Sequence, residues 1–372
     1  MDKITKVDAF HVRWEQGKSP WVRIWAGERY GIGMPSPMAD GNASLELITQ
    51  TSKHLIGQDP MDTAVLHDRL FHEFIKTGPD GAMAGAVAAI DIALWDLKGK
   101  ILGQPIYKLL GGAWRTKMAC YASIGGNSDR NTDAVCREVE SWLKYKPALV
   151  KIRFDGDKTS RDPDIASDIE KARAVRKLVG PRFPLAFDAN NRYSVQGAIK
   201  VGRSLEELGY EWFEEPCQHY HYDSFEKISS ALDIAVSAGE QEYTLQGVQR
   251  LIDAGVDIVQ PDIIKTGGFT GLQRMSVLAM ASGVDFLPHQ TQFVIGEAAT
   301  VHFTAALLHS HYPIECADFI INSGIVFINP LKPVDGFFIL NEKPGLGLEL
   351  YEDRLTERTI PWRSGNGIQP TR

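Results

Sequence analysis

The sequence predicts an α/β protein: a parallel β/α barrel preceded by a smaller α+β domain. From Lys117 onward, short apolar runs alternate with helix-length amphipathic segments, which is the pattern of repeated βαβ units. Eight such runs at a spacing of about 25 residues indicate a closed barrel. Three acids, Asp188, Glu214 and Glu240, each end one of these runs at equal intervals of 26 residues. The carboxyl ends of barrel strands converge on one mouth, so we expect these three side chains to lie close together there.

The first 115 residues lack this alternation. Residues 6–14 and 20–27 predict two strands of a small antiparallel sheet, joined by a polar turn. Apolar residues at three- and four-residue spacing then predict helices, over residues 44–57, 63–76 and 85–112. The last helix is alanine-rich and is interrupted at Gly103 and Pro105.

The barrel strands are predicted from their apolar runs, over residues 117–123, 148–154, 184–189, 210–215, 234–239, 256–262, 284–289 and 312–316. The clearest helices between them cover residues 164–180, 194–209 and 269–283. The sequence after residue 330 returns to a turn-rich, strand-like pattern. We therefore expect a capping domain over residues 1–115, a catalytic barrel over 116–330, and a C-terminal segment, 331–372, that packs back on the capping domain.

Composition excludes some classes of protein. Hydrophobic residues make up 44% and charged residues 23% of the 372-residue chain, which is ordinary for a globular protein. The net charge of −7 argues against nucleic acid as the main partner, because no basic excess is available to neutralise phosphates. The four cysteines form no CxxC pair and indicate thiols in a reducing compartment. No signal segment or membrane span is recognisable, so we expect a cytoplasmic protein without a membrane partner.

The three matched acids predict a metal site. Each acid alone would suit a helix cap or a surface ion pair. Three carboxylates at neighbouring strand ends repel one another unless a cation lies between them, and hard divalent ions such as Mg²⁺ prefer oxygen ligands of this kind. We therefore interpret Asp188, Glu214 and Glu240 as ligands of Mg²⁺.

The chain resembles the enolase superfamily, mandelate racemase subgroup, over nearly its whole length. The resemblance rests on AAIDIALWDLKGKILGQPIYKLLGG (residues 88–112), the three acids, Asp262 in QPDIIKTGG, His289 in LPHQ and Glu315 in YPIEC. It implies a modified (β/α)₇β TIM barrel with an N-terminal α+β capping domain completed by the C-terminal segment. It also implies an essential Mg²⁺, assembly into a homo-oligomer, and chemistry that begins by removing the proton α to a carboxylate.

Within this resemblance, Asp262 and His289 form a dyad in which the carboxylate fixes the tautomer of the imidazole and raises its basicity. The second barrel strand departs from the family. Many relatives carry Lys-x-Lys there, with the second lysine as a base on the opposite face of the substrate, whereas this chain has Lys151 and Arg153. Residues two apart on a strand face the same way, so both should enter the barrel mouth. Arginine stays protonated and is a poor proton acceptor.

With one base remaining, the favoured reaction is the dehydration of an acid sugar, either an aldonate or an aldarate, to a 2-keto-3-deoxy acid. His289 removes the α-proton, Lys151 stabilises the enolate, Glu315 hydrogen-bonds the substrate carboxylate, and Arg153 binds or polarises a substrate oxygen. The small-molecule substrate is expected to meet polar groups near the mouth: Lys18 in the loop from Trp14 to Trp21, and Tyr121, Asn190, His219 and Gln290 near strand ends. Surface or supporting roles suit the four residues near strand ends equally well.

Two alternatives stay open. A racemase, epimerase or cycloisomerase acting on a sugar acid would use Lys151 as its second base or would lose no water. A non-catalytic barrel that serves as a binding protein would be expected to have lost metal or base positions, which this chain retains. The sequence does not separate mono- from diacid substrates.

Overall fold

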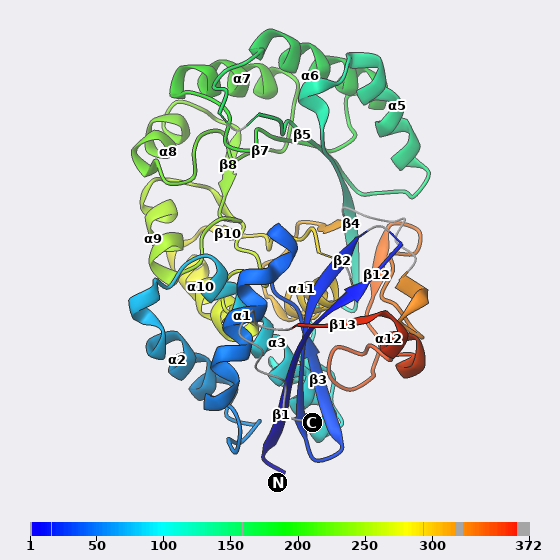
Figure 1. The fold of residues 1–372 in the computed structure, drawn as a ribbon. Coiled ribbons are helices and arrows are strands. Elements are labelled where there is room, and N and C mark those ends of the chain that lie inside the picture. The colour runs from blue at the N-terminus through cyan, green and yellow to red at the C-terminus, as the bar shows by residue number, and fades with distance from the viewer. Residues whose placement is uncertain (1, 16, 158, 293, 317–322, 363–372) are drawn as a thin grey trace.

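The computed structural model describes residues 2–15, 17–157, 159–292, 294–316 and 323–362. Figure 1 shows a ring of strands surrounded by helices, with the N-terminal strands and helices gathered against one side of it. The predicted combination of a parallel barrel and an α+β cap is confirmed. Within the described ranges, no helix is both long enough and apolar enough to cross a lipid bilayer.

The cap is built on an antiparallel sheet with the strand order β13-β1-β2-β3. Its strands are β1 (Ile4–Arg13), β2 (Lys18–Ala26), β3 (Arg29–Gly33) and β13 (Thr359–Pro361). The cap helices are α1 (Asn42–Thr51), α2 (Thr63–Glu73) and α3 (Ala82–Leu102). Helix α3 lies close against β3 because Gly31 and Gly33 carry no side chain; a Cβ atom at Gly31 would fall on the carbonyl oxygen of Ala93.

The barrel strands are all parallel and follow the spatial order β10-β9-β8-β7-β6-β5-β4-β11. In chain order they are β4 (Lys117–Ile124), β5 (Val150–Arg153), β6 (Leu185–Asp188), β7 (Trp212–Glu214), β8 (Ala235–Ala238), β9 (Ile258–Val259), β10 (Asp285–Phe286) and β11 (Ile314–Cys316). The helices between them are α5 (Thr132–Leu143), α6 (Ile165–Val179), α7 (Val195–Glu207), α8 (Tyr222–Ser229), α9 (Leu245–Asp253), α10 (Gly268–Ser282) and α11 (Ile295–Ala306). One helix follows each of the first seven strands, so the described elements have the (β/α)₇β arrangement.

The sixth and seventh barrel strands are shorter than their apolar runs predict. Strand β9 ends before Pro261 and β10 ends before Pro288. Proline has no backbone N–H to donate, so regular pairing stops where it enters the strand. A single parallel bridge between Asp262 and His289 nevertheless continues the alignment of the two strands.

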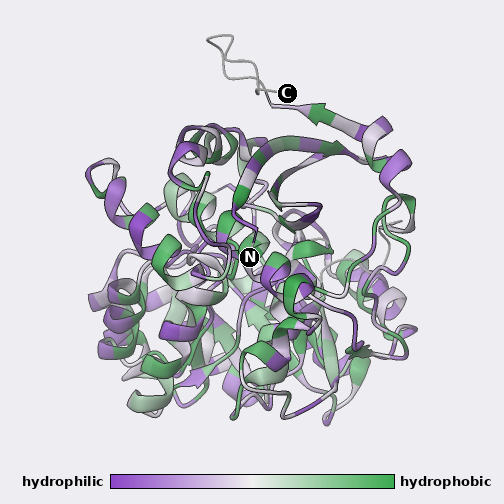
Figure 2. Ribbon diagram, turned by 90° about the horizontal axis from the view of Figure 1, so that it is seen from below, coloured by the Kyte–Doolittle hydropathy of each residue, from purple (hydrophilic) through white to green (hydrophobic). Residues whose placement is uncertain are grey.

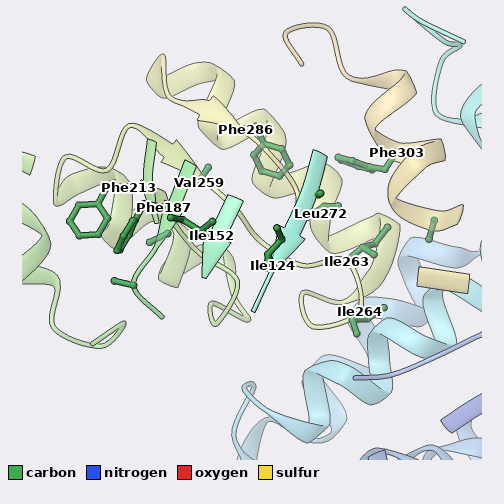
Figure 3. Packing of buried hydrophobic residues seen from close by; sticks show 14 of the residues in the cluster. Ile124, Ile152, Phe187, Phe213, Val259, Ile263, Ile264, Leu272, Phe286 and Phe303 are labelled. Carbon is green, nitrogen blue, oxygen red and sulfur yellow. The ribbon is translucent and has the colours of Figure 1, made fainter. Parts of the chain in front are cut away.

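Hydrophobic side chains fill the space between the strands and their helices. Figure 3 shows Ile152, Phe187 and Phe213 from neighbouring strands packed side by side. The rings of Phe187 and Phe213 meet edge to face at 5.7 Å. Figure 2 shows that the helices at the outside of the molecule carry both hydrophilic and hydrophobic residues. The core therefore fixes the strands, and the strand ends carry the polar groups described below.

Helix α3 joins the cap to the barrel through buried polar side chains. Asp91 accepts hydrogen bonds from the backbone N–H (3.0 Å) and hydroxyl (2.6 Å) of Thr270, in the first turn of α10. Asp96 accepts from the backbone N–H groups of Ile32 in β3 and Leu346 near the C-terminus, both at 2.9 Å. The two acids therefore satisfy backbone donors of a helix start, a strand and a turn, and are themselves satisfied although buried. The motif at residues 88–112 therefore holds the three parts of the chain together.

The C-terminal segment contacts both the cap and the barrel. Strand β13 pairs with β1 in antiparallel fashion, whereas β12 (Phe337–Ile339) pairs with β4, the first barrel strand. Helix α12 (Glu352–Arg358) lies between the two strands in the chain. The short helix α4 (Ile106–Leu109) connects α3 to the barrel. The predicted domain boundaries at residues 115 and 330 stay a prediction.

His302 in α11 provides a test of this packing. The fully buried ring stacks on Tyr107 at 5.6 Å and its Nδ1 accepts a hydrogen bond from the Tyr107 backbone N–H. Burial lowers the pKa of His302 from 6.5 to about 4. In the unfolded chain His302 becomes protonated below about pH 6.5, whereas in the folded chain it stays neutral down to about pH 4. The free energy of unfolding therefore decreases as the pH falls through this window.

We expect this histidine alone to remove about 2 kcal/mol of unfolding free energy between pH 7 and pH 5. Urea unfolding of the native protein and of His302→Gln at both pH values measures it. The loss of stability on acidification should be about 2 kcal/mol smaller in the variant. An equal loss in both proteins would contradict the buried neutral imidazole.

Candidate active site

The carboxylates of the site lie where three consecutive barrel strands end. Asp188 ends β6 and Glu214 ends β7, and the two residues are paired directly across the sheet. Glu240 follows β8 by two residues. Asp188 and Glu214 are each only 1% exposed. Burial, followed by the nearby charge of Glu214, raises the pKa of Asp188 to about 8.

Lys151 in β5 is the buried cation among these acids. Its Nζ lies 2.6 Å from Oε1 of Glu214 and 3.3 Å from Oε1 of Glu315. Burial acts to lower the pKa of Lys151, but the charges of Glu214 and Glu315 outweigh it and raise this pKa well above its usual value. Lys151 is therefore a protonated ammonium group that neutralises two carboxylates.

The barrel interior below supports these same carboxylates. Oε2 of Glu214 accepts from Trp212 Nε1 at 3.1 Å and from Gln260 Nε2 at 3.0 Å. Oε2 of Glu315 accepts from the hydroxyl of Tyr121 at 3.0 Å. Buried carboxylates need such donors, because each lone pair removed from water without a partner is destabilising.

His289 lies between two carboxylates. Its Nδ1 is 2.8 Å from Oδ2 of Asp262, and its Nε2 is 2.8 Å from Oε2 of Glu240. Burial lowers the pKa of His289, but Glu240, Glu315 and the hydrogen bond to Asp262 together raise it well above its usual value. Asp262 is itself held, because its Oδ1 accepts from the backbone N–H of Ile264 at 3.0 Å. Asp262 therefore holds Nδ1 of His289 in place, and Nε2 points toward the carboxylates at the barrel mouth.

A cavity of about 720 Å³ lies above this cluster, between the barrel mouth and the cap. Arg153, Glu240 and His289 are the predicted metal or catalytic residues that line it. The other five, Asp188, Glu214, Lys151, Asp262 and Glu315, lie beneath them inside the barrel and are at most 1% exposed.

The cap supplies a separate wall of this cavity. It comes from the turn η1 (Met38–Gly41), the start of α1 and the start of α3, with the lining residues Ser36, Met38, Ala39, Gly41, Ala43, Ser44, Gly81, Ala82 and Gly85. Ala39 and Asp40 have positive φ angles of 49° and 60°, which non-glycine residues seldom adopt. The backbone carbonyl of Asp40 is held by Nε2 of His11 at 2.8 Å.

The residues expected to contact substrate are found at different depths. Asn190 lines the cavity, whereas Tyr121 is fully buried beneath Glu315. The side-chain amide of Gln290 donates to the backbone carbonyl of Gln292. Lys18 and His219 are not among the lining residues, and Nζ of Lys18 is 3.2 Å from Oδ2 of Asp40.

The segment from Trp14 to Trp21 was expected to be a loop over the substrate. Its described residues form the turn between β1 and β2 and the first residues of β2, and none of them is among the residues that line the cavity. Both tryptophan Nε1 groups donate to Oγ of Ser19, at 2.7 Å from Trp14 and 2.9 Å from Trp21. Trp21 is buried against Phe327, with ring centroids 5.6 Å apart. The cap residues that face the cavity follow β3.

Sequence reasoning missed several polar residues of the site. Lys265 lines the cavity, with Nζ 3.7 Å from Oε1 of Glu240. Gln241 also lines it and donates to Glu215, a buried carboxylate whose positive φ of 43° follows the end of β7. The position of Lys265, three residues after Asp262 in QPDIIKTGG, was the available signal. Glu242, by contrast, accepts from the hydroxyl of Tyr222 at 2.9 Å.

The donor set at the mouth suits a hard divalent cation. Asp188, Glu214 and Glu240 offer only oxygen atoms, and their mutual repulsion contributes to the raised pKa of Asp188. Among the described residues, no three His, Cys, Asp or Glu side chains are already converged as a ligand set. Glu214 is turned toward Lys151 and Glu240 toward His289. These two carboxylates would have to exchange ion-pair contacts for a metal.

The Lys151 network generates a stability prediction. Lys151→Met leaves the carboxylates of Glu214 and Glu315 buried without their cation, and we expect a loss of about 3–5 kcal/mol of unfolding free energy. Adding Glu315→Gln removes one of the two stranded charges. The double variant should therefore be more stable than the sum of the two single losses predicts, by at least about 1 kcal/mol. Urea unfolding with a metal chelator present measures all three variants; strictly additive losses would contradict the network.

Comparison with known proteins agrees with this architecture. Residues 27–111 match the family described as mandelate racemase / muconate lactonizing enzyme, N-terminal domain. Residues 134–354, more than half of the chain, match the family described as enolase C-terminal domain-like.

Individual relatives cover most of the chain. A D-galactarolactone cycloisomerase of Agrobacterium fabrum is 31% identical over 89% of this chain and 88% of its own length. An arabinonate dehydratase of Saccharolobus solfataricus is 30% identical over 79% of this chain and 77% of its own. A crystal structure of a mandelate racemase/muconate lactonizing protein from Paracoccus denitrificans, complexed with magnesium, is 53% identical, with a TM-score of 0.95 over 97% of this chain and 99% of its own. The chain therefore belongs to the enolase superfamily, in its mandelate racemase subgroup.

Proposed function

We propose that this protein is an Mg²⁺-dependent hydro-lyase that dehydrates an acid sugar to a 2-keto-3-deoxy acid. The observation that carries the proposal is the asymmetry of the site around its cavity. His289, held by Asp262, is an acid/base group on one side. On the side of β5, Lys151 is locked between Glu214 and Glu315, and Arg153 is paired with Asp155 at 2.9 Å. A site with one competent base suits elimination better than two-base racemisation.

Relatives with this chemistry support the proposal. They include the arabinonate dehydratase, an L-talarate/galactarate dehydratase of Salmonella typhimurium that is 30% identical over 87% of this chain, and a D-galactonate dehydratase of Variovorax paradoxus that is 29% identical over 98%. The magnesium complex of the Paracoccus protein supports the choice of metal.

Asp188, Glu214 and Glu240 are the proposed ligands of Mg²⁺. The bound ion supplies positive charge that stabilises the negative charge developing on the substrate carboxylate when the α-proton leaves. With Glu240 holding the metal, Nε2 of His289 would be released from its contact with this carboxylate and could face the substrate.

The proposed reaction breaks one C–H bond and one C–O bond. Nε2 of His289 takes the α-proton, while Asp262 on Nδ1 stabilises the imidazolium that forms. The electron pair left on the α-carbon forms the new C=C bond as the β-hydroxyl departs. The imidazolium returns its proton to that hydroxyl, so water leaves and the enol becomes the 2-keto-3-deoxy acid.

The remaining residues hold charge and geometry. Lys151 keeps a fixed positive charge beneath the reacting carboxylate, where it favours the enolate. Glu315, held by Tyr121, is proposed to hydrogen-bond the substrate carboxylate. Arg153 carries a permanent positive charge. Burial acts to lower the pKa of its guanidinium group, but the charges of Asp155 and Asp188 outweigh burial and raise this pKa above its usual value. It binds substrate oxygens and does not exchange protons.

Cycloisomerisation is the second candidate, because the Agrobacterium relative is named for it. A reaction that opens a lactone ring after removal of the α-proton also needs only a single base. A cytoplasmic location, a role in carbohydrate catabolism and a homo-oligomeric state also belong to the proposal. None of the four cysteines, all of them among the described residues, forms a disulfide and three are buried, which suits a reducing compartment.

A screen of the Mg²⁺-loaded protein against mono- and diacid sugars tests the function. We expect semicarbazide trapping to detect a 2-keto acid with at least one substrate. His289→Asn should lower kcat by about 10³-fold or more, because the proton carrier is lost. Calorimetry should show that this variant still binds Mg²⁺. If the native protein binds metal and releases no 2-keto acid from any sugar, isomerisation without water loss becomes the better assignment.

The single-base assignment has its own test at Arg153. Arg153→Lys places a group with a titratable proton on the second face, and we expect recovered substrate in D₂O to gain deuterium together with the opposite configuration at carbon 2. Arg153→Met is the matched control, since it removes the charge without adding a base. The native protein should show no such exchange. If the native protein already inverts carbon 2, the single-base assignment is wrong.

A further inference from the structure

We infer that the cavity selects monoacid sugars, aldonates, over the matched diacids, aldarates, because the described residues that line it offer no cation for a second carboxylate. This inference rests on the proposed function and names the substrate class of the same site. The first carboxylate of any acid sugar is required at the reaction centre. The question is what the rest of the cavity presents to the far end of the substrate.

Each lining cation already faces a carboxylate. Among the described lining residues, the lysines and arginines are Arg153 and Lys265. Nη2 of Arg153 is 2.9 Å from Oδ2 of Asp155, and Nζ of Lys265 is 3.7 Å from Oε1 of Glu240. Lys18, the cation of the nearby cap turn, is paired with Asp40 at 3.2 Å. A second substrate carboxylate would have to displace one of these protein carboxylates.

The pair of Arg153 and Asp155 is also fixed from behind. Asp155 accepts a hydrogen bond from the backbone N–H of Gly126 through its other oxygen. The guanidinium group lies against Gly125, where a Cβ atom would come 2.5 Å from Nη2. Arg153 is therefore held toward Asp155 by its packing as well as by charge.

The wall around Arg153 is acidic on balance. It is formed by the segments after β4 and β5, and its charged lining residues are Asp129, Arg153 and Asp155, with a formal charge of −1. A distal carboxylate placed here would meet like charge, which is strongly unfavourable in a partly desolvated site. A neutral hydroxyl group, in contrast, can donate to these aspartates.

The cap wall adds no charge. Its lining residues are small or apolar, apart from the hydroxyls of Ser36 and Ser44. Elsewhere the cavity offers neutral polar groups, with Asn190, Gln241, Tyr243, Thr291 and Gln292 among the lining residues. Amides and hydroxyls suit a polyol chain that ends in a neutral CH₂OH group.

Matched pairs of substrates test the inference. D-Galactonate and galactarate, D-gluconate and glucarate, and D-mannonate and mannarate differ only in whether carbon 6 is CH₂OH or a carboxylate. For the configuration that the Mg²⁺-loaded native protein accepts, we expect kcat/KM for the monoacid to exceed that for the diacid by about tenfold or more. A preference for the diacid, or equal values, would overturn the inference and leave the dehydratase function standing.

Asp155→Asn releases Arg153 and should shift this ratio toward the diacid by about tenfold. Asp157→Asn is the matched control. It removes the same charge from the same loop, but Asp157 does not line the cavity. Its carboxylate accepts hydrogen bonds from the backbone N–H and the hydroxyl of Thr159. An unchanged ratio in Asp155→Asn, or an equal shift in both variants, would overturn the role of the Arg153–Asp155 pair.

If the native protein dehydrates no sugar of the set, the proposed function fails and calorimetry still tests the selectivity. Binding of monoacids to the Mg²⁺-loaded native protein should then be about tenfold or more tighter than binding of the paired diacids. Equal binding, tighter diacid binding, or binding of neither overturns the inference.

Discussion

The structure of the site depends on one electrostatic constraint, the crowding of buried carboxylates at the ends of the barrel strands. Asp188, Glu214 and Glu315 are almost inaccessible to water, so their charges must be balanced within the protein or by a bound cation. Lys151 balances part of this charge from beneath, and hydrogen bonds from the barrel interior satisfy individual oxygens. The raised pKa of Asp188 indicates that the protein does not balance the negative charge of this carboxylate, so a bound divalent ion would stabilise the site most strongly there.

The cap depends on the same principle at a smaller scale. Helix α3 is apolar on nearly all sides, yet it carries Asp91 and Asp96 in its buried middle. Asp91 accepts from Thr270 of the barrel and Asp96 accepts from Leu346 of the C-terminal segment, so these hydrogen bonds form only when cap, barrel and C-terminal segment are docked. This ties the cap wall of the cavity to the catalytic strands through specific polar contacts in addition to apolar packing.

The barrel could be predicted because its strands are short apolar runs that recur at a regular spacing along the chain. Three acids also recur at the same place in three successive βα units. Asp188, Glu214 and Glu240 could be aligned from spacing alone, and the resemblance supplied Asp262, His289 and Glu315. Side-chain partners were beyond reach, since the contact between Lys265 and Glu240 joins two loops whose separation is set by the whole barrel. The cap wall was also missed. The segment from Trp14 to Trp21 was expected to contribute a loop at the substrate, but Trp14 and Trp21 donate to Ser19 and Trp21 packs on Phe327, contacts that only tertiary packing reveals.

The two walls of the cavity come from different parts of the chain, one from the cap and one from the barrel. The lining residues of the cap, which fall within 36–44 and 81–85, face the cavity and make no side-chain hydrogen bond to any of the described proton-transfer or metal-ligand side chains. Mutations there can reshape the volume and polarity offered to a ligand while the acid–base groups keep their positions. In evolutionary terms, the chemistry and the choice of molecule can diverge by separate substitutions, so a lineage built on this scaffold can acquire new nutrients while it retains one reaction step.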